Sequence, residues 1–101
     1  MIEVRTTFIF DRWLDKLRDR RARVKIAAPT DRIRGGNFGD WKPISSGVCE
    51  LRLTYGPGYR LYYVQPKARE VVMLCGGGKD TQSRDIVRAK KIAAHLDIYL
   101  E

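Results

Sequence analysis

The sequence lacks any long apolar run. No segment approaches the roughly 18 consecutive apolar residues that a membrane-spanning helix needs. The N-terminal stretch MIEVRTTFIF also lacks the cationic start and extended apolar segment that are typical of a secretory signal peptide. The sequence therefore predicts a cytoplasmic protein with no membrane partner.

Metal-ligating residues are scarce. The chain has one histidine, His95, and two cysteines, Cys49 and Cys75, spread without the spacing of a zinc site. In a reducing compartment the two thiols are most simply small buried hydrophobes, with a disulfide as the less favoured alternative. We therefore expect neither a bound metal nor a small-molecule cofactor.

A phosphate-binding nucleotide loop is also missing. Three glycines precede Lys79, but the GxxxxGK[ST] pattern is absent. A glycine-rich stretch that opens a helix can present backbone donors to an anion. Such glycines can equally mark the exit of a strand, and both interpretations remain open.

Positive charge, in contrast, is abundant. Twenty Lys and Arg residues face twelve Asp and Glu residues, which gives a net charge of +8 and a sequence pI near 9.9. The block RDRRARVK (18–25) is dense in cations, whereas residues 43–51 carry none. This balance favours an anionic partner, although a basic surface can also serve solubility alone.

The periodicity predicts an α+β fold in one domain, residues 1–101. A length of 101 residues with 44% apolar residues suffices for one packed core. We expect an N-terminal strand, two helices, a three-stranded antiparallel sheet and a C-terminal helix, with the helices on one face of the sheet. In chain order the expected strands are 2–6, 48–54, 59–65 and 70–75, with helices from Phe8 and Asp19 and over 81–96.

Two interruptions belong to this prediction. Pro29 lies inside the second helical segment, where proline costs roughly 3 kcal/mol, so a kink or break is expected near residues 26–29. Residues 36–47 contain three glycines and a proline, and they are expected to form a loop.

A charged residue stands inside the strand-like run GPGYRLYY. Strand alternation places Arg60 and Tyr62 on one face with Glu50 and Arg52, and a turn centred on Pro57 would pair Arg52 with Tyr62. This face is either a water-exposed sheet surface with an ordinary ion pair or a site for phosphates and bases. The pattern leaves both interpretations open.

Four segments together resemble the RelE/ParE superfamily of bacterial toxins. The resemblance covers nearly the whole chain and is nearest to the branch of addiction module killer proteins, HigB-like toxins and related phage proteins. The expected element order is similar to the RelE-like fold. The segments are FDRWLDKLRDRRARVKI (10–26), IRGGNFGDWKPI (33–44), ELRLTYGPGYRLYY (50–63) and LCGGGKDTQSRDIVRAK (74–90).

The resemblance implies a toxin of a type II toxin–antitoxin pair. RelE-like and HigB-like members cut mRNA on the ribosome, whereas ParE-like members bind DNA gyrase and are not nucleases. In the nuclease branch, the basic motif positions correspond to Arg52, Arg60 and Lys79 of this sequence. The implied partners are a cognate antitoxin from an adjacent gene, with a helix-turn-helix domain, and mRNA with the ribosome.

The chain departs from the nuclease pattern at two positions. Glu50 occupies the place of a second basic residue, two positions before Arg52. The C-terminal tyrosine or histidine of some nuclease members has no clear match near Ile86. A gyrase-binding toxin without nuclease activity and a decayed, non-toxic homologue therefore remain alternatives.

The expected nuclease chemistry assigns roles to the candidate residues. Attack of a ribose 2′-hydroxyl on the adjacent phosphate needs a base, an acid and cations, and no metal. Arg52 and Arg60 suit the developing charge because a guanidinium matches phosphate oxygens. Lys79 adds charge or serves as the acid, and Glu50 is a chemically sensible base.

Three further residues are candidates for RNA contacts. Tyr62 is expected to stack on a base, and Lys42 is expected to contact the RNA. Trp41, beside Lys42, is either such a contact or a cap on the core.

Overall fold

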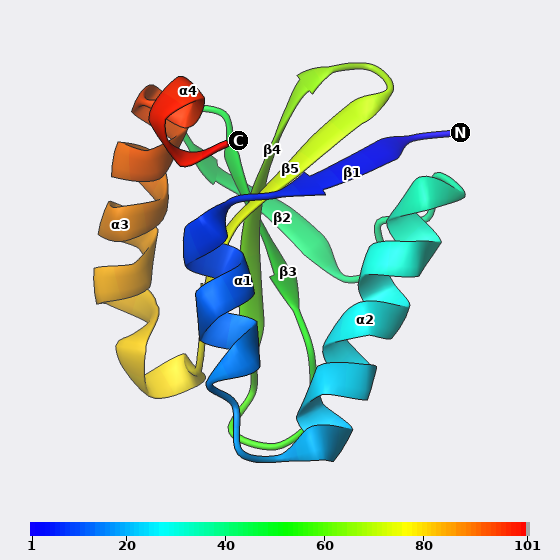
Figure 1. Ribbon diagram of the computed structural model, residues 1–101, viewed down its shortest axis with the longest axis vertical. Helices are drawn as coiled ribbons and strands as arrows, with labels where there is room; N and C mark the ends of the chain where they lie inside the picture. Colours follow the sequence, from blue (N-terminus) through cyan, green and yellow to red (C-terminus); the bar gives the residue numbers. More distant parts are fainter. Residues whose placement is uncertain (101) are drawn as a thin grey trace.

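The computed structural model describes residues 1–100 and confirms the α+β class. Figure 1 shows helices on both sides of one twisted sheet, whose five strands follow the order β1-β5-β4-β3-β2. Within the described residues, no helix combines the length and apolar character needed to cross a membrane. The elements are β1 (Glu3–Thr6), α1 (Phe8–Asp15), α2 (Arg20–Arg34), β2 (Trp41–Ser45), β3 (Val48–Arg52), β4 (Arg60–Lys67), β5 (Glu70–Gly77), the short 3₁₀ helix η1 (Lys79–Thr81), α3 (Gln82–Ala94) and α4 (Leu96–Tyr99).

The predicted three-stranded sheet is wrong, because two more strands extend it. β1 pairs in parallel with β5, with Val4 opposite Val71. Residues 41–45, expected to be loop, form β2 and pair antiparallel with β3. Pro43 fits there because β2 is an edge strand, where a missing backbone N–H need not break a ladder.

The prediction of helices on a single face is also wrong. One core cluster lies between the sheet and α2 and includes Phe10, Ile26, Ile33 and Leu61. A second cluster lies between the sheet and α3 and includes Ala89 and Ile92. α1 lies between α2 and α3 and packs against β5 (Figure 1). Both faces of the central strands β4 and β5 are therefore covered by helices, whereas the edge strand β2 stays largely exposed.

The predicted break at Pro29 does not occur. α2 runs without interruption from Arg20 to Arg34, and the Pro29 ring is buried with Ile26 and Ile33 on the face toward the sheet. Asp19 caps the start of the helix by accepting a hydrogen bond from the Arg21 N–H at 2.9 Å. Burial of the apolar face on both sides of the proline offsets the lost backbone hydrogen bond.

The register of β3 and β4 differs by two residues from the prediction. Arg52 lies opposite Arg60 and Glu50 opposite Tyr62, so the turn is centred on Gly56 and not on Pro57. Gly56 has φ +61°, a conformation that glycine adopts without strain. Because side chains alternate with a period of two, this shift leaves every side chain on its predicted face.

Two of the three glycines, Gly76 and Gly77 at the end of β5, serve close packing. A Cβ atom on Gly76 would lie 2.4 Å from the Trp13 ring, and one on Gly77 would lie 1.9 Å from Oδ2 of Asp85. Trp13 belongs to α1, and Asp85 belongs to α3. These glycines therefore let two helices approach the same strand from opposite sides, which supports the strand-exit interpretation.

We expect Gly77→Ala to lower the free energy of unfolding by at least about 2 kcal/mol, because the new methyl group overlaps a hydrogen-bonded carboxylate. Gly35→Ala is the matched control, since its Cβ would meet its nearest neighbour at 3.5 Å. Urea denaturation measures both changes, and the control should stay within about 0.5 kcal/mol of wild type. Equal stability of the two variants would contradict this account of the glycines.

Stability should also fall in alkaline solution. Burial, together with the Asp85 charge, raises the pKa of the Cys75 thiol from 9.0 to about 12. Above about pH 9 the unfolded thiol ionises while the folded thiol stays protonated, so the free energy of unfolding should fall by up to roughly 1.4 kcal/mol per pH unit. Cys75→Ala should flatten this slope between about pH 9 and 10 in urea titrations. An unchanged slope would exclude Cys75 as its source.

Candidate functional site

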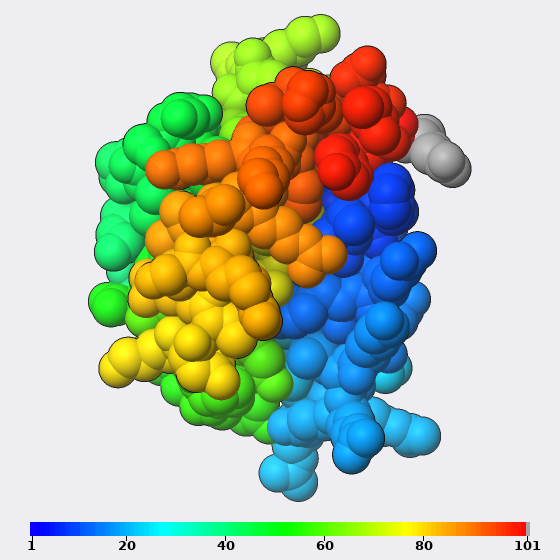
Figure 2. All heavy atoms as spheres, turned by 90° about the vertical axis from the view of Figure 1, so that its left-hand side faces the viewer, coloured from blue at the N-terminus to red at the C-terminus, as the bar shows by residue number. Residues whose placement is uncertain are grey.

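Three predicted cations from separate segments meet at one end of the sheet. Arg52 at the end of β3 lies opposite Arg60 at the start of β4, and Arg60 lies opposite Gly77 at the end of β5. The Lys79 N–H donates to the Pro57 carbonyl at 3.4 Å, which ties the start of η1 to the β3–β4 turn. Figure 2 shows this turn directly beside the segment that opens α3. We call Arg52, Arg60 and Lys79 the cationic end of the sheet.

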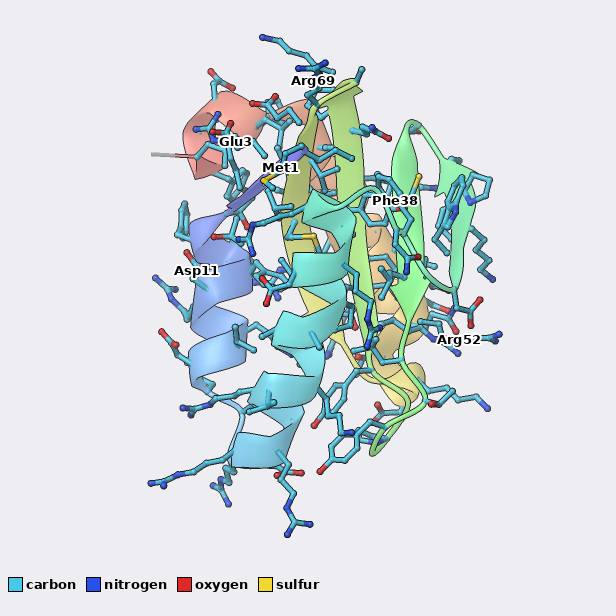
Figure 3. All side chains as sticks on the ribbon, turned by 90° about the vertical axis from the view of Figure 1, so that its right-hand side faces the viewer. Met1, Glu3, Asp11, Phe38, Arg52 and Arg69 are labelled. Carbon is cyan, nitrogen blue, oxygen red and sulfur yellow. The ribbon has the colours of Figure 1, made fainter. Side chains whose placement is uncertain are left out.

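The three cations differ in accessibility. Lys79 is exposed, and the Arg52 side chain is 56% exposed and points away from the body of the molecule (Figure 3). Arg52 Nε also pairs with Oδ2 of Asp40 at 3.1 Å. Arg60, in contrast, is only 7% exposed. Two of the three are therefore available to an anionic ligand, and the third lies beneath them.

A second row of side chains runs across the sheet next to the cationic end. In register, Lys42 of β2 lies opposite Glu50 of β3, and Glu50 lies opposite Tyr62 of β4. Directly paired residues share a face, so all three side chains project toward α3. We call Lys42, Glu50 and Tyr62 the carboxylate row.

Glu50 is the centre of this row and is 2% exposed. Its Oε1 lies 3.7 Å from Nζ of Lys42 and 3.9 Å from a terminal guanidinium nitrogen of Arg60. Its Oε2 accepts a hydrogen bond at 2.9 Å from Nε2 of Gln82 in α3. Both oxygens of the buried carboxylate therefore have partners, which come from three different elements.

Two buried polar atoms beside Glu50 have no hydrogen-bond partner among residues 1–100. They are Nε of Arg60 and the hydroxyl of Tyr62. Burial, and then the neighbouring charges of Glu50 and Asp85, raise the pKa of Tyr62, so its hydroxyl stays protonated at neutral pH. An unpaired buried group of this kind costs about 1–3 kcal/mol and is typical of a site that gives up stability for another role.

The expectation that a base stacks on Tyr62 is not met in this arrangement. The Tyr62 ring is 0% exposed because it packs beneath α3 with Ala89 and Ile92. Strand alternation shows which residues share a sheet face, but it does not show whether water or a helix covers that face.

Lys42 and Trp41 lie on opposite faces of the sheet. Lys42 is opposite Glu50, on the face toward α3, whereas Trp41 is opposite Leu51, on the face toward α2. Trp41 is 48% exposed, and the centroid of its ring lies 6.4 Å from that of Phe38. The two neighbours therefore cannot contact one ligand from the same surface.

Sequence analysis did not identify Gln82 and Asp85 as part of the site. Gln82 holds Glu50, and Asp85 accepts a hydrogen bond from the Thr81 hydroxyl at 2.5 Å. The signal that was present is helical spacing, since both residues extend the buried stripe of α3 back from Ala89 at steps of three and four. Among residues 1–100, no group of three or more His, Cys, Asp or Glu side chains is placed to hold a metal.

Comparison with known proteins places the chain beside a relative without assigning an activity. No family model matches the chain. A protein of Haemophilus influenzae described as "Uncharacterized protein" is 45% identical over 97 residues, which span 96% of this chain and 98% of that protein. The chain belongs to the same family as this Haemophilus protein. The relative's description names no activity, so the toxin resemblance stays a prediction.

The Glu50–Arg60 contact gives a test of the buried carboxylate. We expect Glu50→Leu to lower the free energy of unfolding by about 3 kcal/mol, because it leaves the Arg60 guanidinium buried without its carboxylate. The double variant Glu50→Leu/Arg60→Met should recover more than half of that loss, because it removes both charges together. Urea denaturation measures both variants, and a double variant no more stable than the single one would argue against coupling.

Proposed function

We propose that this protein is a toxin of the RelE/ParE superfamily in a type II toxin–antitoxin module, acting as a metal-independent, ribosome-dependent mRNA endonuclease. The supporting observation is the cationic end of the sheet. Three separate segments between positions 52 and 79 supply Arg52, Arg60 and Lys79. The fold gathers these cations around the ends of β3, β4 and β5. The resemblance assigned basic roles to the same three residues.

The proposed reaction is a transesterification within the RNA strand. The ribose 2′-oxygen bonds to the adjacent phosphorus while the bond from phosphorus to the 5′-oxygen breaks, which leaves a cyclic phosphate and a 5′-hydroxyl. A base takes the 2′-proton, and an acid donates a proton to the leaving 5′-oxygen. Arg52 and Lys79 are the exposed cations for the phosphate, and Lys79 is the candidate acid.

Glu50 and Arg60 have more restricted roles in this proposal. Arg60 holds Oε1 of Glu50, and Gln82 holds Oε2, the oxygen that would accept a proton. Glu50 serves as the base only when Gln82 releases this oxygen, so catalysis requires the start of α3 to shift on the ribosome. Without that shift, the contact between Arg60 and Glu50 only holds the ends of β3 and β4 in place beneath the exposed cations Arg52 and Lys79.

The proposed antitoxin partner follows from charge. With a net charge of +8, the chain suits an antitoxin with an acidic arm, because opposite charges accelerate and orient association.

Arg52 and Lys79 provide the sharpest test of cleavage. We expect purified protein with ribosomes and mRNA to give cuts in phase with codons, visible when RNA 5′ ends are mapped. Arg52→Ala and Lys79→Ala should each slow cleavage by roughly a hundredfold, because each removes a cation from the developing phosphate charge. Lys67→Ala, at the exposed β4–β5 turn, is the control with the same loss of charge and should cleave normally.

A gyrase-binding toxin without nuclease activity is the second candidate. It is favoured by the burial of Glu50 and Tyr62, since side chains closed off from solvent do not reach an RNA substrate. Inhibition of gyrase supercoiling with intact RNA would support that candidate and exclude the nuclease. Normal bacterial growth when the chain is induced alone would exclude both, and would indicate a non-toxic homologue.

A further inference from the structure

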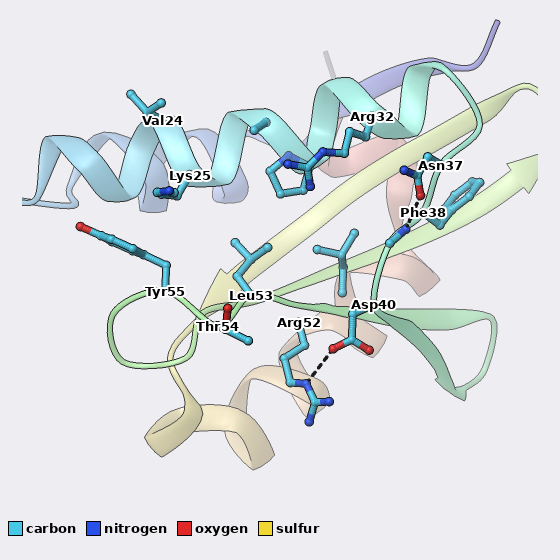
Figure 4. Close-up of a pocket in the computed structure, with 14 residues that line it drawn as sticks. Val24, Lys25, Arg32, Asn37, Phe38, Asp40, Arg52, Leu53, Thr54 and Tyr55 are labelled. Carbon is cyan, nitrogen blue, oxygen red and sulfur yellow. Dashed lines mark hydrogen bonds and ion pairs between the residues drawn. The ribbon is translucent and has the colours of Figure 1, made fainter.

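A groove lies on the opposite side of the sheet from α3. It runs between α2 and the end of β3, beside the loop of residues 37–40, and encloses about 670 Å³ (Figure 4). Pro29, Leu51 and Leu53 are among the apolar residues that line it. Arg52 borders the groove at its rim, with its side chain pointing away from α2 (Figure 4).

The charges that line the groove are mostly positive. Lys25 and Arg32 of α2 line it, whereas the Arg52 side chain points away from α2 (Figure 4). Neither Lys25 nor Arg32 forms an ion pair among residues 1–100. The one acidic residue in the lining, Asp40, is paired with Arg52. The groove therefore has two cations without acidic partners and fits an anionic ligand.

Aromatic rings stand at two positions along the groove. The Tyr55 ring lies 5.8 Å from Nζ of Lys25, and its hydroxyl donates to Asp19 at 2.8 Å, which fixes its orientation. Phe38 lines the groove near Asp40, and the exposed Trp41 ring lies next to Phe38. Rings beside cations are the arrangement that binds single-stranded nucleic acid, with bases stacked on the rings and phosphates on the cations.

We propose that this groove binds a segment of single-stranded RNA, with Tyr55 stacking on a base and with Lys25 and Arg32 contacting phosphates. An acidic peptide fits the groove less well. β3 is paired on both sides, with β2 and β4, so the groove offers no free strand edge to which an extended peptide could add. To reach the cationic end of the sheet, the RNA strand would pass around the rim of the groove at Arg52.

The identification of this strand as mRNA rests on the proposed function, but binding to the groove is measured without ribosomes. The probe is a fluorescein-labelled single-stranded RNA of mixed sequence, about twelve nucleotides long, followed by fluorescence anisotropy. We expect Lys25→Glu/Arg32→Glu to weaken binding at least about tenfold and to reduce its salt dependence, because two phosphate contacts are lost. Lys67→Glu/Arg69→Glu is the control with the same change in net charge, at the exposed β4–β5 turn, and should weaken binding less than about twofold.

Stacking is tested by a second pair of variants. Tyr55→Leu should weaken binding about tenfold, whereas Tyr55→Phe keeps the ring and should bind like wild type. Circular dichroism shows whether each variant is folded. If Tyr55→Phe binds as weakly as Tyr55→Leu, the hydroxyl contact with Asp19 matters and the stacking role is overturned.

Two outcomes separate this inference from its rivals. If both charge-reversed pairs weaken RNA binding equally, the groove is not the binding site, because binding would then depend only on the net charge of the protein. Competition by poly-glutamate as strong as by unlabelled RNA of the same charge would overturn RNA in favour of an acidic protein partner. If RNA binds with the expected variant pattern but ribosomal mRNA is not cut, the groove is supported and only the nuclease proposal fails. If mRNA is cut but the groove variants bind RNA like wild type, the nuclease proposal is supported and only the groove fails.

Discussion

The buried carboxylate of Glu50 is the constraint on which the rest of this structure depends. A carboxylate removed from water is costly unless cations and hydrogen bonds replace its hydration. Here Lys42, Arg60 and Gln82 supply that replacement, and they come from β2, β4 and α3. Each element must take its observed position for Glu50 to be satisfied. The carboxylate therefore contributes little net stability, but it fixes how an edge strand, a central strand and a helix sit together.

The close approach of α3 that this arrangement needs is made possible by Gly77. Asp85 occupies the space that a Cβ atom at position 77 would fill, and this brings the first turn of α3 against the end of β5. From there Gln82 reaches Glu50 across the sheet. On the other face, Gly76 makes the same allowance for Trp13. Two neighbouring glycines thus place one helix on each side of a strand, and the polar site lies beneath one of them.

Local sequence patterns predicted those parts of the fold that depend on local periodicity. The central antiparallel strands and the faces of Arg52 and Arg60 were predicted, and the faces tolerated a register error of two residues. The places of both long helices were also predicted, but not the continuity of α2 through Pro29. The edge strand β2 was missed because Pro43 and the preceding glycines are typical of loops. The parallel pairing of β1 with β5 joins residues far apart in sequence, and no local pattern specifies it. The covering of the polar face by α3 was missed because a buried charge network and a water-exposed face give the same alternation.

For the candidate site, the resemblance singled out Arg52, Arg60 and Lys79, and the fold brings these three together. Neither the resemblance nor the periodicity identified the partners of Glu50, because Gln82 meets it only through tertiary packing. Lys25 belongs to the dense basic block of residues 18–25, but Arg32 lies outside that block, and the position of α2 above β3 was not predicted.

Arg52 lies at the rim between the two candidate surfaces, and its surroundings suit that position. Its ion pair with Asp40 joins two side chains that are both more than half exposed, and such pairs are worth about 0–1 kcal/mol. A phosphate can therefore replace Asp40 on the guanidinium at little cost. Arg60, buried against Glu50, cannot exchange partners in this way. The sheet end thus combines one arginine that can exchange its ionic partner with one that is held in place.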